Sequence, residues 1–152
     1  MAYIAREARL ELLETIAEAT DAIGLALAAL GGAYEQLDER SGDRLEDTLF
    51  RPVQVAYGRA KRTHAGFAAR HGLPGRSFEP ATAGVPSQGV KGFLDRALEA
   101  VAEADGILAD LQDSMMPVEV GDPELRAGIA EVRELVGGVR GQGREFLRTF
   151  GR

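Results

Sequence analysis

The apolar residues of this chain recur at alternating steps of four and three over several long stretches. Between Ser87 and Met116 the alternation has no gap, and the same holds from Leu12 to Leu37. This spacing puts one continuous apolar stripe on a helix, which then packs lengthwise against other helices. The stripe of the first of these stretches consists of Val90, Leu94, Ala97, Val101, Ala104, Leu108, Leu111 and Met115. The pattern therefore predicts an all-α protein.

Four helices are expected, separated by two short turns and one long loop. The predicted helices cover about residues 3–40, 43–71, 87–116 and 122–150. The long loop, residues 72–86, contains three prolines and three glycines, which preclude regular structure. Short links make successive helices antiparallel. The simplest arrangement is a four-helix up-and-down bundle in a single domain, residues 1–152, with the long loop closing over one end.

Two places should disturb these helices. Pro52 lies inside the second pattern, where it removes a hydrogen bond and clashes with the carbonyl of Thr48, so we expect a kink or a split there. Four glycines between residues 137 and 143 cost about 0.8–1 kcal/mol each relative to alanine. Something should offset that cost. Two hypotheses are a tight crossing of Gly24 against Gly137 and a cavity or bound ligand at mid-height.

The first helix is apolar on nearly every side between residues 22 and 33. Such a segment is buried all round. One interpretation is a helix enclosed by the rest of the bundle. The other is a homodimer whose contact is made by Ala22, Leu25, Ala29 and Gly32.

The composition excludes several kinds of catalytic and metal-binding site. The chain has no cysteine, which excludes disulfides and thiolate chemistry, and it has two histidines, neither in a Glu-x-x-His pair. No Gly-x-Ser-x-Gly motif occurs, and no apolar run approaches the roughly 18 residues of a membrane span. We expect no catalytic residue, metal or cofactor, no membrane span, and a cytoplasmic protein that is not an enzyme. The net charge of −6 argues against nucleic acid as a partner.

The charges are unevenly distributed along the chain. No acidic residue lies between Asp47 and Glu79, a stretch that holds six basic side chains. In an up-and-down bundle, the end of the second helix and the end of the fourth share one pole. That pole would gather Arg59, Arg62, His64, Arg70, His71, Arg76, Arg144 and Arg148. We expect it to receive an anionic ligand or an acidic protein surface. The interpretation requires Arg70 and Arg148 to lie at the same end.

These observations favour a non-enzymatic helical-bundle protein that binds a partner or self-associates through such a basic pole. The alternative is a small-molecule-binding or catalytic bundle with a pocket near His64 and Tyr57. No motif names a reaction.

Overall fold

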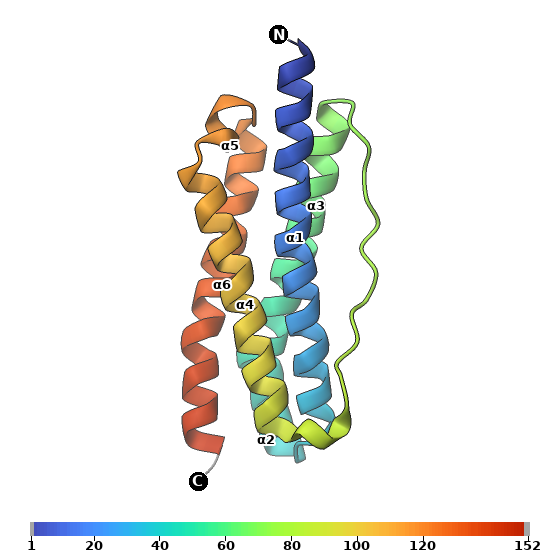
Figure 1. Ribbon diagram of the computed structural model, residues 1–152. Coiled ribbons are helices and arrows are strands. Elements are labelled where there is room, and N and C mark those ends of the chain that lie inside the picture. Colours follow the sequence, from blue (N-terminus) through green and yellow to red (C-terminus); the bar gives the residue numbers. More distant parts are fainter. Residues whose placement is uncertain (1, 151–152) are drawn as a thin grey trace.

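The structure is a computed structural model, and it describes residues 2–150; the first residue and the last two of the predicted domain lie outside this range. Four long helices pack side by side, which confirms the all-α four-helix bundle (Figure 1). They are α1 (Ala2–Glu35), α3 (Arg51–Arg70), α4 (Gly89–Asp113) and α6 (Pro123–Phe150). Shorter elements complete the chain: α2 (Glu39–Leu45), η1 (Glu46–Phe50), η2 (Pro86–Gln88) and α5 (Met116–Glu119).

The predicted stripes form the core. Every stripe residue of α1 from Leu12 to Ala33 is buried, and the stripe of α4 is buried from Leu94 to Leu111. The stripes end where the bundle ends: Met115, in a left-handed conformation with a φ of 66°, is 49% exposed, and Phe150 is 40% exposed. The interior is well filled, because the void beside Thr20 and Thr63 measures only about 10 Å³.

The directions of the helices differ from the expected order. α1 runs down in Figure 1 and α3 runs up, but α4 also runs up and α6 runs down. The connection 71–85 does not close over one end; it crosses the whole length of the bundle as an extended strap. The strap runs alongside α1 and is bonded to it at three places. The Gly72 carbonyl accepts a hydrogen bond from Arg6, and Arg76 pairs with Asp21. At the far end, the Pro86 carbonyl accepts a hydrogen bond from Gln36.

This crossover makes every packed pair of long helices antiparallel. α1 packs against α4 and α3, and α6 packs against the same two helices. The parallel pairs, α1 with α6 and α3 with α4, lie on the diagonals. A bundle with one long crossover connection is the known alternative to the up-and-down order. The sequence expectation was wrong on this point because a loop of this length can span the bundle as easily as it can cap it.

The boundary between the first and second helices also differs. α1 ends at Glu35 and not near residue 40, and Asp38 caps α2 by accepting a hydrogen bond from the Ser41 backbone N–H at 3.1 Å. Gly42, expected in a turn, is buried inside α2, where the ring of Tyr34 lies over it. The turn is therefore made by residues 36–38.

Pro52 disturbs the helix as expected, but in another form. The chain from Glu39 to Arg70 neither breaks nor separates; instead η1 is a single π-turn immediately before the proline. The Arg51 N–H donates to the Glu46 carbonyl, five residues back. A π-turn inserts one extra residue and is found frequently at functional sites.

The glycines of α6 do not break that helix, which is continuous to Phe150. Gly24 does not meet Gly137, because α1 and α6 are diagonal; Gly24 lies under the ring of Tyr57, on α3. A close contact of α6 instead pairs Gly128 with Thr63 of α3, where a Cβ would overlap the threonine side chain.

α1 has the length and composition of a membrane-crossing helix over Ile4–Glu35, with a mean hydropathy of 1.3 in its most apolar window. More than half of that window, 56%, is buried inside the bundle. In the bundle α1 contributes a large share of the core, with Leu12, Ile23 and Leu30 fully buried. Ala22 and Ala29 are buried, and Gly32 lies against the ring of Phe93 on α4. Of the face predicted to contact a second copy, Gly32 is thus in contact with α4, and Leu25 is half-buried.

Candidate functional site

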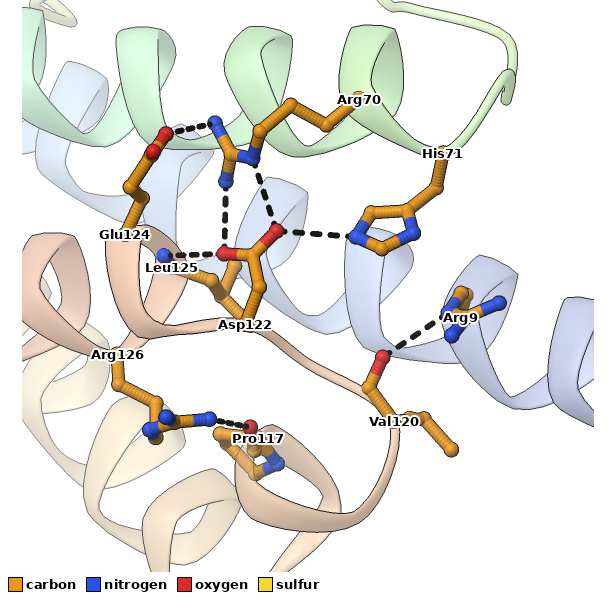
Figure 2. A network of polar contacts seen from close by, with 9 residues as sticks. All are labelled: Arg9, Arg70, His71, Pro117, Val120, Asp122, Glu124, Leu125 and Arg126. Atoms are coloured by element: carbon orange, nitrogen blue, oxygen red, sulfur yellow. Dashed lines mark hydrogen bonds and ion pairs between the residues drawn. The ribbon is translucent and has the colours of Figure 1, made fainter.

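Asp122 is the centre of a polar network at the end of the bundle where α3 stops and α6 starts (Figure 2). Its Oδ1 accepts from the Leu125 backbone N–H at 2.8 Å and from Nη2 of Arg70 at 2.9 Å. Its Oδ2 accepts from Nε of Arg70 at 2.8 Å and lies 2.9 Å from Nε2 of His71. Asp122 therefore caps α6 and ties the last turn of α3 to it, as its position before Pro123 favours.

The electrostatics of this network are strong because the carboxylate is mostly enclosed. The Arg70 guanidinium, followed by the Leu125 N–H and the His71 ring, holds the pKa of Asp122 far below its ordinary value, although burial acts in the opposite direction. The same hydrogen bond raises the pKa of Arg70. Arg70 also contacts Glu124 at 2.9 Å. Its charge is fully compensated within the chain.

Two further arginines at this end are held by backbone carbonyls. Arg9 donates to the Val120 carbonyl at 3.0 Å, and Arg126 donates to the Pro117 carbonyl at 3.1 Å (Figure 2). Both bonds fix the turn that joins α5 to α6. Polar contacts at this end of the molecule thus connect α1, α3 and α6 with the turn between α5 and α6.

Arg148 lies at the opposite end from Arg70, so a single basic pole does not exist. Arg70 contacts the first turn of α6, whereas Arg148 is in the last turn of the same helix and pairs with Glu145 at 2.5 Å. Arg44 of α2 reaches Thr149 there, which places the start of the second helical segment at that end. The expected gathering of positive charge depended on the up-and-down order and fails with it.

The remaining predicted basic residues are dispersed. Arg59 contacts Glu131 at 2.5 Å across α3 and α6, and Arg76 contacts Asp21 at 2.9 Å across the strap and α1. Arg144 borders a hollow of about 430 Å³ between α4 and α6, together with Arg140, Asp95 and Glu99. Arg62 is exposed on α3 and makes no ion pair with the described residues.

His64 is in the interior, beneath the strap. It is 3% exposed, and its Nδ1 has no hydrogen-bond partner among the described residues. Phe78 of the strap covers it edge-on, with ring centroids 5.4 Å apart, and Arg76 lies over Phe78 at 4.8 Å. Burial, and secondarily Arg76, lower the pKa of His64.

Side chains fill the region predicted as an alternative pocket. The Tyr57 ring packs on Gly24, Lys61 lies 4.3 Å from the centre of that ring, and Phe78 covers His64. Burial raises the pKa of Tyr57. Neither His64 nor Tyr57 lines any of five hollows that lie among the described residues. Residues 2–150 also hold no cluster of metal-binding side chains.

Three of these five hollows lie beside η1. An open groove of about 640 Å³ separates η1 and the start of α3 from α6. A second hollow, of about 280 Å³, lies between η1 and the end of α1. A third, of about 220 Å³, lies where α2 and η1 meet the end of α6. Sequence reasoning missed this region, although Pro52 and the glycines of α6 were signals of it.

Glycines help to open the larger groove. Its apolar lining comes from Pro52, Leu135 and Val139, and Gly138 lines it without adding a side chain. A Cβ on Gly138 would meet no described atom within 4 Å. Asp47, Glu131 and Glu134 line the same groove, with Thr48 and Gln142, and no basic side chain does. The result is an apolar groove bordered by negative charge.

Comparisons with protein-family models, with curated proteins and with solved structures found no match for this chain.

Proposed function

We propose that this protein is a non-enzymatic binding module that receives a basic, amphipathic segment of a partner protein in the groove between η1–α3 and α6. The observation that carries the proposal is the lining of that groove: three carboxylates around an apolar floor, with no cation among them. A volume of about 640 Å³ is within the range of ligand sites, about 300–1,000 Å³. Because the groove is open along the helices, it suits a chain segment better than an enclosed small molecule.

The charges favour a basic partner for two reasons. Glu134 makes no ion pair with the described residues, and the pairs formed by Asp47 with Arg51 and by Glu131 with Arg59 have exposed carboxylates. Exposed pairs of this kind contribute little to stability, so a partner's cations can compete for them. The net charge of −6 also steers positive surfaces towards the molecule. The partner is thus opposite in charge to the anion expected from the sequence.

A titration with synthetic peptides tests the proposal. Labelled protein is mixed with an amphipathic lysine–leucine helix or with its glutamate–leucine counterpart, and amide shifts are followed by NMR. The lysine peptide should shift residues that line the groove, and the glutamate peptide should not.

Two variants sharpen this experiment. Gly138→Leu fills the groove and should weaken binding of the lysine peptide. Gly106→Leu, at an exposed glycine of α4 with equally open surroundings, should leave it unchanged. Equal binding by both variants, or shifts that avoid the groove, would contradict the proposal.

A further inference from the structure

The hollow of about 280 Å³ between η1 and the end of α1 has a different chemistry from the groove. Gly31, Tyr34 and Glu35 of α1 line one side of it, and Glu46 and Phe50 of η1 line the other. Two aromatic rings and two carboxylates therefore share a space of about 280 Å³, and no basic side chain lines it.

Both carboxylates are free of internal partners. Neither Glu35 nor Glu46 makes a side-chain hydrogen bond or an ion pair with any residue of the described range 2–150. The negative charge at this hollow is therefore available to an external cation.

The aromatic side chains are held in place by the backbone. Tyr34 is 44% exposed, and its ring rests on Gly42, where a Cβ would stand 3.3 Å from Cε2 of the tyrosine. Glu46 and Phe50 are the first and last residues of the π-turn, so the extra residue of that turn sets their positions. On the α1 side, a Cβ at Gly31 would meet no described atom within 4 Å, which keeps the hollow open.

We propose that this hollow binds an organic cation of the alkylammonium class. Aromatic faces attract such cations through the ring quadrupole, and neighbouring carboxylates add direct charge attraction. The volume is close to the lower limit of ligand sites, about 300 Å³, which suits a small headgroup. This site is on the other side of η1 from the groove, and it does not depend on the proposed partner.

Choline and 3,3-dimethylbutan-1-ol form a matched pair of probes, because the alcohol has the same shape without the charge. In an NMR titration, choline should give saturable shifts at Gly31, Tyr34 and Phe50, and the alcohol should give none at the same concentrations. Equal binding by the alcohol would mean that the hollow recognises apolar shape and not charge, and it would overturn the proposal. Choline shifts located elsewhere would overturn it as well.

Variants separate the two contributions. Tyr34→Leu should weaken choline binding about threefold to thirtyfold through loss of the ring, whereas Tyr34→Phe should retain it. Glu46→Gln should also weaken it, with less dependence on salt than the unmodified protein. Tyr34 is exposed and Glu46 is half-buried, and neither side chain belongs to the core, so these changes leave the core intact. Unchanged binding by Tyr34→Leu and Glu46→Gln would contradict the assignment.

A short peptide carrying trimethyllysine identifies the source of the cation. Binding tighter than that of choline, with shifts that extend past the hollow, assigns the ammonium group to a protein side chain. Equal affinity for peptide and choline assigns it to a free small molecule. Failure of both to bind would overturn the proposal.

Discussion

The side chain of His64 is buried with one ring nitrogen unpaired, which fixes the direction of its titration. The charged form is disfavoured first by loss of solvent, to which Phe78 above the ring contributes, and second by the charge of Arg76 on the strap. The pKa of His64 is thus lower in the folded protein than in the unfolded chain.

Below about pH 6.5 the unfolded chain therefore binds a proton at this histidine that the folded protein does not. The free energy of unfolding should fall as the pH drops from about 6.5 towards the lower pKa of the folded state, and should level off below it. His64→Leu should remove this slope. Urea unfolding at about pH 7.5 and about pH 5 measures it, and an identical slope in the variant would exclude His64 as its cause.

Asp122 shows how one carboxylate can secure two helix ends. Asp122→Asn keeps a capping side chain but loses the charged, two-point contact with Arg70, so it should cost about 1.5–3 kcal/mol of unfolding free energy. Asp122→Ala should cost about 1 kcal/mol more, because the cap is lost as well. Chemical denaturation of the three proteins measures both steps. Equal losses in the two variants would show that the cap contributes nothing.

The same residue predicts a response to acid. Because the pKa of Asp122 is depressed by folding, its contribution is present above the ordinary carboxyl value of about 4 and is lost as the pH falls below it. Asp122→Asn should therefore lose less stability than the unmodified protein between about pH 4 and pH 2. Parallel acid-unfolding curves would contradict this assignment.

At the scale of elements, the glycines of α6 have opposite roles that their sequence positions do not reveal. Gly137→Ala should stabilise the protein by about 0.8–1 kcal/mol, since it is exposed and a Cβ there meets no described atom within 4 Å. Gly128→Ala should destabilise it by about 1–3 kcal/mol, because the added carbon overlaps the buried, β-branched Thr63. Thermal unfolding of the two variants measures both effects. If Gly128→Ala also stabilised the protein, α3 and α6 would have to move apart at Gly128 without cost.

The π-turn at η1 shows what a pattern of apolar residues predicts and what it omits. Pro52 marked the disturbed position correctly, because its missing N–H and its ring clash follow from covalent structure. The form of the adjustment depends on what the surrounding helices allow. Here η1 packs against α1 and α6, and the chain inserts one residue and stays helical. The hollows beside η1 depend on how the π-turn packs against the surrounding helices, so they could not be derived from Pro52 alone.

At the scale of the whole molecule, the sequence determines which faces are buried but not which ends meet. The stripe of α4 was predicted residue by residue and is buried from Leu94 to Leu111, because burial follows the local periodicity. The partners of Arg70 and Arg148 depend on the directions of α4 and α6. Those directions depend on the end of the bundle at which the strap joins α4. The charge pattern therefore led to the assignment of Arg70 and Arg148 to one pole. In the structure they lie at opposite ends, where Asp122 pairs with Arg70 and Glu145 pairs with Arg148.

The length of the strap supports this topology and can be tested. Sixteen Cα steps from Arg70 to Pro86 reach about 55 Å at full extension, while α4, with 25 residues, is about 37 Å long. Deleting residues 75–84 leaves a reach of about 21 Å, too short to carry the chain back to the start of α4. That deletion should abolish the folded monomer, giving an unfolded chain or a dimer that exchanges α4 and α6 between copies.

Deleting Ala81–Ala83 leaves about 45 Å and should preserve the monomer, because the crossing is still possible. The longer deletion also removes the ion pair of Arg76 with Asp21 and the packing of Phe78 on His64. The double variant Arg76→Ala with Phe78→Ala controls for that removal, and it should remain a folded monomer. Circular dichroism and size-exclusion chromatography distinguish these states. A folded monomer lacking residues 75–84 would require α4 to run in the opposite direction, with Arg70 and Arg148 brought to one end after all.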